Sequence, residues 1–292
     1  MTFRKILCPI DFSPGSQQAM RTAVRLATEG DAELVLAHAW YLPPVATGGE
    51  SLMSADLVQQ LSDDAQRALD DAVREATSLG ARRVTPKLLK GVPWTAITDA
   101  AMEGVDVIVI GTHGRTGLAR ILLGSVAEAV VRHAPCPVIV VRPEVAPGPF
   151  THVLCPVDFS ASGHQAMELA GRLAQPDGAG ITLLHVVELP VAYSGELQLA
   201  GIYRDLDKAS VDLLEEWAKE LRTKTIVPVT TRCRIGYPGA ETLAVLDEDR
   251  TFDLVVMGSH GRTGIARALL GSVAEKVVRH ARCSVLVARS RH

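Results

Sequence analysis

The sequence contains few aromatic residues and no excess of basic ones. Phe, Trp and Tyr make up 4% of its 292 residues, and the formal net charge is −3 at pH 7. Proteins that bind single-stranded nucleic acids use aromatic stacking platforms in basic grooves, and anionic membranes attract basic patches. The composition therefore argues against a nucleic acid or a membrane surface as the partner.

Long apolar runs and paired cysteines are also missing. The longest apolar runs, such as DVIVIG and PVIVV, have the length of a strand and are far short of a membrane span. The segment MTFRKILCPIDFS reaches Asp11 too early for the apolar core of a signal peptide. The five cysteines form no CxxC pair and indicate reduced, small apolar residues; they are Cys8, Cys136, Cys155, Cys233 and Cys283. We therefore expect a cytoplasmic protein.

Two common phosphate-binding sequences are absent. The chain has no GxxxxGK[ST] sequence, and no tight GxGxxG opens a helix after the first expected strand. A phosphate site in this protein must therefore have another form.

What the sequence does contain is one framework twice. GTHGRTGLARILLGS at 111–125 returns as GSHGRTGIARALLGS at 258–272, 147 residues later, with 12 of 15 residues identical. The opening ILCPIDFS likewise returns as VLCPVDFS at the same offset, while the middle of the copies slips by two residues. This pattern is typical of a tandem repeat with insertions in its loops. We expect domains over 1–143 and 150–292, joined by a short stiff linker at 144–149.

Each copy alternates apolar strands with helices. In the first copy the pattern predicts strands at 3–10, 32–40, 82–91, 105–111 and 136–142, and helices at 16–30, 61–79, 94–102 and 125–133. Gly30 is expected at the C′ position of the first helix. Such alternation indicates a parallel sheet covered by helices on both faces, a doubly wound α/β unit. In these sheets ligands bind at the carboxyl ends of the strands, where the winding reverses.

The repeated glycine loop lies between a strand and a helix, at that edge of the sheet. Its glycines permit positive φ angles and a close backbone approach to a ligand; they are Gly111, Gly114, Gly117 and Gly124. The N–H groups that open the next helix favour an anion, and so does the guanidinium of Arg115. Together these parts suit a polyphosphate.

A purely structural interpretation of the same loop stays open. SVAE, at 125–128 and 272–275, is a capping box, in which Ser125 and Ser272 would only cap a helix.

The glycine spacing resembles the ATP-binding signature of the universal stress protein family. Gly111-x2-Gly114-x9-Gly124-Ser125 returns as Gly258-x2-Gly261-x9-Gly271-Ser272, and CPIDFS and CPVDFS resemble the family's first strand and its Asp. The resemblance covers both copies almost end to end. It implies two tandem Rossmann-like (adenine nucleotide alpha hydrolase-like) α/β domains, each with a five-stranded parallel sheet of order 3-2-1-4-5. It also implies ATP or another adenine nucleotide as ligand, with Mg²⁺ or Mn²⁺.

By motif position, the resemblance implies one nucleotide site in each repeat. In the first repeat the residues carried over are Ile10, Asp11, Ala39, Gly111, Thr112, His113, Gly114, Arg115, Gly124, Ser125 and Val126. In the second they are Val157, Asp158, Val186, Gly258, Ser259, His260, Gly261, Arg262, Gly271, Ser272 and Val273. The Asp of each set would lie near adenine or ribose, and the loop residues near the ribose and phosphates. The family often has valine after the histidine of the second strand, as at Val186; Ala39 departs from this pattern.

Several of these and nearby side chains have simpler interpretations. An Asp that directly follows a strand also forms turns and helix caps. A histidine in the glycine loop either touches phosphate or is an exposed loop residue. His38 and His185 interrupt apolar strands, and we interpret them as hydrogen-bonded core histidines. HAPC at 133–136 and HARC at 280–283 would bind zinc only if the copies brought both pairs together, and packing at a helix end is the simpler interpretation.

Two classes of function remain. In one, the protein is a regulatory or stress-response module whose bound nucleotide alters its conformation or its choice of protein partner. In the other, it is a slow ATPase or a nucleotidyl-transfer enzyme. The loop has no lysine, no positioned nucleophile and no obvious carboxylate base, so we favour binding without turnover.

Assembly and mobility are also predicted. Family dimers commonly associate through the last strand, so the resemblance implies an intrachain pseudo-dimer through 136–142 and 283–289, and a homodimer of the tandem chain is a further expectation. Prolines and glycines in 42–56 predict a mobile loop there.

Overall fold

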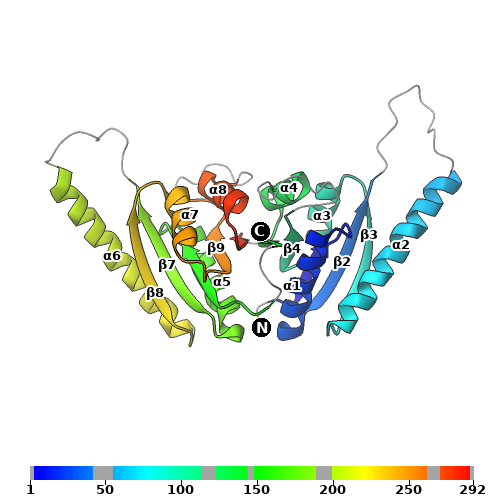
Figure 1. Ribbon diagram of the computed structural model, residues 1–292, viewed down its shortest axis with the longest axis horizontal. Coiled ribbons are helices and arrows are strands. Elements are labelled where there is room, and N and C mark those ends of the chain that lie inside the picture. The colour runs from blue at the N-terminus through cyan, green and yellow to red at the C-terminus, as the bar shows by residue number, and fades with distance from the viewer. Residues whose placement is uncertain are drawn as a thin grey trace, which may run out of the picture. The chain divides into compact units, whose positions relative to one another are not determined.

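A computed structural model describes residues 3–41, 55–112, 123–143, 148–188, 199–261 and 270–289. The chain divides into two compact units, Met1–Pro143 and Glu144–His292, and each has its own sheet with helices packed against it (Figure 1). Among the described residues, no helix combines the length and the apolar character that a membrane crossing requires.

The two units contain the same series of elements. The strands of the first unit are β1 (Lys5–Pro9), β2 (Glu33–Trp40), β3 (Val84–Lys90), β4 (Val107–Gly111) and β5 (Val138–Val141). Its helices are α1 (Pro14–Gly30), α2 (Ala55–Ser78), α3 (Pro93–Ala101) and α4 (Ser125–His133). The strands of the second unit are β6 (His152–Pro156), β7 (Gly180–Val187), β8 (Val229–Ile235), β9 (Leu254–Gly258) and β10 (Ser284–Ala288). Its helices are α5 (Ala161–Asp177), α6 (Leu199–Lys224), α7 (Pro238–Glu248) and α8 (Ser272–His280).

Within each unit the strands are parallel. Their order is β3-β2-β1-β4-β5 in the first unit and β8-β7-β6-β9-β10 in the second, which confirms the predicted order. The chain winds outward from β1 to β3 and then returns past β1 to β4. Right-handed crossovers therefore place α1 beside α2 and α3 beside α4. The winding reverses between β1 and β4, and ligands bind at such a point in open α/β sheets.

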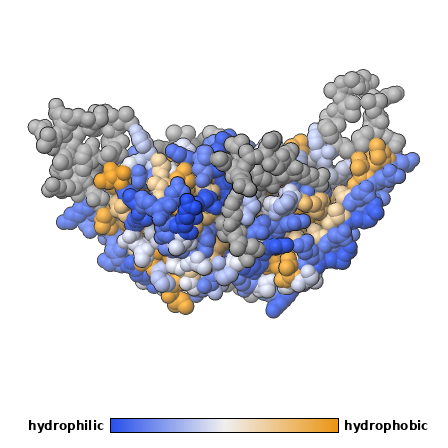
Figure 2. All heavy atoms as spheres, viewed as in Figure 1, coloured by the Kyte–Doolittle hydropathy of each residue, from blue (hydrophilic) through white to orange (hydrophobic). Residues whose placement is uncertain are grey.

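The central strands form the core of each unit. All five residues of β4 are buried, and so are the side chains of Ile6 and Leu7 in β1. The long helix α2 buries Leu69, Ala72 and Ala76, which lie on one helical face. Hydrophilic residues cover its outer side, at the right of Figure 2. Burial of the strands on both faces explains why they are near-continuous apolar runs in the sequence.

One long helix begins earlier than the sequence pattern predicts. Helix α2 begins at Ala55 rather than Leu61. The residues ADLVQQ at 55–60 are mostly good helix formers, and the helix propagates through them. The predicted loop at 42–56 therefore overlaps the start of α2, and its remaining part, 42–54, lies outside the described residues.

The end of α1 also differs from the prediction. Gly30 is the last helical residue, and Asp31 takes the left-handed conformation, with φ 48° and ψ 44°. Asp tolerates this conformation better than most residues. A Cβ at Gly30 would lie 3.4 Å from the carbonyl oxygen of Phe3, so this glycine provides room against the segment that precedes β1.

Candidate functional site

The turn between β1 and α1 is held by a short hydrogen-bond network. Asp11 Oδ1 accepts from the backbone N–H of Ser13 over 3.1 Å and from its hydroxyl over 2.6 Å. The Ser13 side chain in turn accepts from the Ser16 N–H and caps α1. Phe12, between them, has φ 66°, a left-handed conformation that costs a bulky residue about 1–3 kcal/mol. The structure thus holds a strained residue at the carboxyl end of the central strand.

His38 supports this strained turn from β2. Its Nδ1–H donates to the carbonyl oxygen of Ile10 over 2.7 Å, and its ring lies against Phe12 with the centroids 4.6 Å apart. His38 is buried, as predicted for a hydrogen-bonded core histidine. The interaction fixes the peptide that precedes Asp11.

The second unit repeats the arrangement. Asp158 Oδ1 accepts from the N–H and hydroxyl of Ser160, Phe159 has φ 62°, and the Nδ1–H of His185 donates to the carbonyl oxygen of Val157 over 2.8 Å. Both units therefore keep the strained conformation together with the hydrogen bonds that support it. The turn is a constrained part of the structure in each unit.

The two ends of the glycine loop are joined by one hydrogen bond in each unit. The Gly124 N–H donates to the carbonyl oxygen of Thr112 over 2.7 Å, and the Gly271 N–H donates to that of Ser259 over 2.8 Å. The loop therefore leaves the sheet and enters the helix at the same place. The predicted site residues between these ends that lie outside the described residues are His113, Gly114, Arg115 and Arg262.

The described loop glycines do not use positive φ angles. Gly124 has φ −61° and Gly271 has φ −64°, values that any residue adopts. Close packing is the constraint instead. A Cβ at Gly111 would lie 2.6 Å from the carbonyl oxygen of Gly15, and one at Gly261 would lie 2.8 Å from Asp158 Oδ2.

The capping-box interpretation of SVAE is wrong. The N-cap residues of α4 and α8 are Gly124 and Gly271, and Ser125 and Ser272 are the first helical residues, with no side-chain capping bond at either end. The glycine N–H bonds to the loop's first carbonyl and the glycine is extended, so the glycine takes the N-cap position and the helix starts one residue earlier than a serine N-cap would place it. The two serine hydroxyls are therefore not committed to capping these helices.

A cavity of about 750 Å³ opens where the winding of the first sheet reverses. All the described residues predicted for the first site line it: Ile10, Asp11, Ala39, Gly111, Thr112, Gly124, Ser125 and Val126. The cavity thus joins four segments that are far apart in the sequence. Its volume is within the range of about 300–1,000 Å³ that is typical of small-molecule sites.

The cavity wall combines an anion-binding end with polar and apolar groups. The first turn of α4, at 125–127, lines one part, and helix N-termini attract anions. Asp11 and Asp64 contribute carboxylates. The indole N–H of Trp40 is buried and has no hydrogen-bond partner among the described residues. A buried donor of this kind is costly unless an acceptor reaches it, so it favours a polar ligand.

In the second unit the predicted residues occupy the matching positions. Val157 and Asp158 follow β6, Val186 is buried in β7, and Gly258 ends β9. Gly261 packs against the Asp158 carboxylate, so the loop and the first turn meet. Ser259, Gly271, Ser272 and Val273 join the loop to α8.

His260 is half-buried and does not match the interpretation as an exposed loop histidine. Its Nδ1 lies 2.9 Å from the Ser259 hydroxyl oxygen, and its Nε2 is buried with no hydrogen-bond partner in the described part of the chain.

The sequence model of the universal stress protein family matches residues 2–142 and again 149–289. The chain belongs to this family. A universal stress protein of Mycobacterium tuberculosis H37Rv is 30% identical over 292 aligned positions, which cover 97% of this chain and 96% of the relative. The crystal structure of a universal stress protein from Archaeoglobus fulgidus has a TM-score of 0.69 at 21% identity, covers 98% of both chains and shows the same fold. A further universal stress protein, solved in complex with cAMP, covers 49% of this chain at 26% identity with a TM-score of 0.39.

The HxxC pairs of this universal stress protein have packing roles in the described residues. Cys136 and Cys283 are each 1% exposed. His133 Nδ1 donates to the carbonyl oxygen of Ala129 over 2.8 Å, and its ring lies 4.9 Å from that of Trp94. These contacts fit the simpler of the two interpretations.

Sequence reasoning missed part of the cavity wall of this universal stress protein. The additional lining residues include Phe12, His38, Trp40, Tyr41, Leu61, Asp64, Ala65, Ala68, Pro93 and Ile97. Most of them come from β2, α2 and α3 and carry no motif. One signal was present, since Phe lies between Asp and Ser in both copies of the opening segment.

Proposed function

We propose that this protein is a nucleotide-dependent regulatory module in which each repeat, 1–143 and 150–292, binds one adenine nucleotide. ATP with Mg²⁺ or Mn²⁺ is the proposed ligand. The observation that carries the proposal is the cavity at the reversal of the first sheet, because every described residue predicted for the first site lines it.

The cavity has parts that suit each portion of a nucleotide. Ile10, Ala39 and Ala65 supply apolar surface for a base, and the unpartnered Trp40 N–H supplies a donor for a base or ribose acceptor. The N-terminus of α4 suits phosphate. Asp11 and Asp64 are the carboxylates on the wall that would hold a divalent ion, and such an ion would neutralise phosphate charge.

The same wall argues against fast turnover. No lysine or arginine is among the described lining residues, and the Asp11 carboxylate is engaged by Ser13. A cradle without a positioned base or nucleophile binds more readily than it catalyses. A slow ATPase or nucleotidyl-transfer activity is the alternative, and turnover with ATP and Mg²⁺ above about 1 per second would favour it.

One experiment tests the proposal directly. Small molecules are released from freshly purified, gently handled protein by denaturation and identified by mass, and the refolded or stripped chain is titrated with ATP. We expect adenine nucleotide approaching two per chain and saturable binding of ATP. No released nucleotide together with no ATP binding would refute the proposal.

We also infer that the repeats associate through their last strands. β5 and β10 each lie at one end of their own unit's strand order and are apolar, and unpaired apolar edges invite association. Each repeat expressed alone should then form homodimers or aggregates, as gel filtration with light scattering would report. Two well-behaved monomers would contradict the inference.

A further inference from the structure

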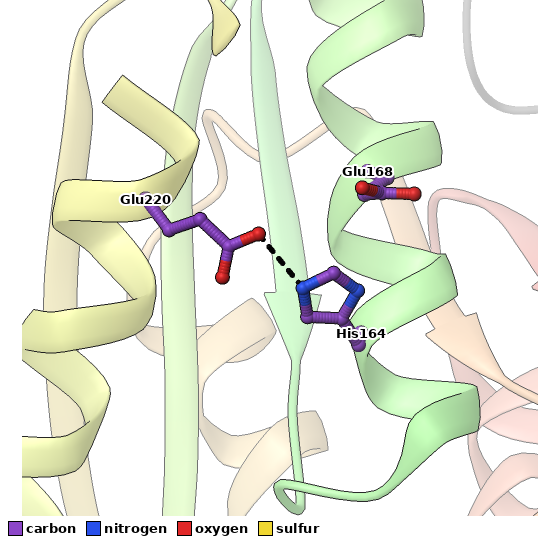
Figure 3. Close-up of side chains that lie close together, drawn as sticks. All are labelled: His164, Glu168 and Glu220. Atoms are coloured by element: carbon purple, nitrogen blue, oxygen red, sulfur yellow. Dashed lines mark hydrogen bonds and ion pairs between the residues drawn. The ribbon is translucent and has the colours of Figure 1, made fainter. Parts of the chain in front are cut away.

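The contact between α5 and α6 in the second unit brings together three side chains of the types that bind metal ions. His164 and Glu168 come from successive turns of α5, and Glu220 faces them from α6 (Figure 3). One ligand atom from each residue lies within 4.8 Å of the others, and His164 Nε2 lies 2.9 Å from Glu220 Oε1. Among the described residues, no other three His, Cys, Asp or Glu side chains converge in this way.

We propose that His164, Glu168 and Glu220 form a binding site for a divalent transition-metal ion of the zinc type. One imidazole nitrogen and two carboxylates are a normal ligand set for zinc, and water completes the four positions. Ligand atoms around tetrahedral zinc lie roughly 3.4 Å apart, so closing the site requires side-chain adjustment and no backbone movement.

A cation already bridges the two carboxylates of the group. The ammonium of Lys224 donates to Glu168 Oε1 and Glu220 Oε1, over 2.7 Å each. The two carboxylates carry one more charge than this single ammonium neutralises. Lys224 is exposed on the last turn of α6, so it can swing into solvent when a metal ion takes its place. It therefore acts as a tethered competitor of the metal ion.

The imidazole is also held in place. The His164 ring packs edge-on against Trp217, with the centroids 5.3 Å apart and the planes at 83°. Trp217 in turn packs edge-on against Phe159, next to Asp158. This packing limits the rotation of the ligand and reduces the entropy lost on metal binding.

The first repeat provides a natural comparison. The residues that correspond to His164 and Glu168, 147 positions earlier, are Gln17 and Arg21. In the first repeat Glu75 pairs with Arg21 at 4.0 Å, and in the second Glu220 pairs with Lys224, the partner of Glu168. The second repeat thus has two ligand-type residues where the first has an amide and a cation. The metal site is therefore specific to the second repeat.

The test is a calorimetric titration of the metal-stripped, nucleotide-free full chain with ZnCl₂, repeated with Co²⁺ for its visible absorption spectrum. We expect one Zn²⁺ per chain at this site. His164→Gln, which introduces the residue of the first repeat, should weaken binding at least tenfold and remove the cobalt spectrum. Lys224→Met should tighten binding several-fold because the competitor is lost, and a misfolded variant could not produce that gain.

Matched controls assign the ion to this site. His280→Gln removes an exposed imidazole of an HxxC pair and should leave the affinity unchanged. Circular dichroism should show native folding of every variant. The proposal is overturned if the wild-type chain binds no Zn²⁺, or if binding is unchanged in His164→Gln and not enhanced in Lys224→Met.

Discussion

Phe12 and Phe159 show how this protein treats single residues at its candidate sites. Each adopts a left-handed conformation between an Asp that forms the turn and a Ser that caps a helix. Each ring is then held against a buried histidine, His38 or His185. The cost of the conformation is offset by these contacts, and the Asp is thereby fixed at the carboxyl end of the central strand.

Trp40 offers a residue-scale test of the proposed first site. Trp40→Phe keeps a large ring and removes the unpartnered N–H. A neutral hydrogen bond contributes roughly 0.5–1.5 kcal/mol, so we expect ATP affinity at the first site to fall about two- to twelvefold. The second repeat has Val187 at this position and should be unaffected. Isothermal titration measures both sites.

Trp94→Phe is the matched control for that experiment. Trp94 lies against His133 and is not among the residues that line the cavity, so ATP binding should not change. Equal affinities in Trp40→Phe and the wild-type chain would show that the indole N–H does not meet the nucleotide.

At the scale of elements, the sequence predicted most of the fold because buried parallel strands and their helices have distinct periodicities. The predicted bounds of β4 and α4 agree with the structure to within two residues. The reason is that β4 is a strictly apolar run and that a glycine marks the limit of each element. The start of α2 was not predicted, although Ser54, a residue type favoured at N-caps, directly precedes Ala55. The α2 wall of the cavity was missed although a helix was predicted at 61–79, because contacts such as those of Asp64 depend on tertiary packing.

Two helix starts that look alike in sequence should respond differently to mutation. Ser13 caps α1 through its side chain, so Ser13→Ala should destabilise the folded chain by about 0.5–2 kcal/mol. Ser125 caps nothing, so Ser125→Ala should change stability by less than about 0.5 kcal/mol. Urea unfolding of the nucleotide-free protein distinguishes the two. Similar losses in both variants would contradict the assignment of Gly124 as the N-cap.

The contact between α5 and α6 should depend on pH. Hydrogen bonds from Lys224 hold the pKa values of Glu168 and Glu220 below their ordinary range. Carboxyl groups with lowered folded-state pKa values stabilise the fold above the ordinary carboxyl pKa of about 4.3, and this stabilisation is lost as the pH falls through the lower folded-state value. Lys224→Met should therefore lower the thermal midpoint at neutral pH.

The same difference should shrink as the carboxylates become protonated. Thermal melts from neutral pH down to about pH 3 measure it, with metal ions removed by a chelator. Lys208→Met, an exposed substitution on the same helix, is the control. A Lys224→Met deficit that stays constant across this range would show that the ion pairs do not contribute.

At the scale of the whole molecule, duplication gives this protein two units with the same strand order and the same hydrogen bond across the ends of the glycine loop. Their surroundings have diverged, as Trp40 against Val187 and Arg21 against Glu168 show. The shared fold follows from local sequence patterns that both copies keep. The differences between the copies lie in side chains that no motif constrains. Each proposed site can therefore be altered separately while the other repeat serves as an internal reference.

Gly124→Leu and Gly271→Leu exploit this duplication. Gly124 has φ −61° and ψ 146°, so a leucine there strains no backbone and places a side chain at the opening of α4, beside the cavity. If the glycine loops hold phosphate, calorimetric ATP stoichiometry should fall from about two to one in either variant and to zero in the double variant. A Cβ at Gly271 would lie 3.2 Å from the Ser259 carbonyl oxygen, so a modest stability loss is expected there. Circular dichroism should stay native-like throughout. A stoichiometry of two in the double variant would show that the loops do not hold the nucleotide, and the proposed function would fail with it.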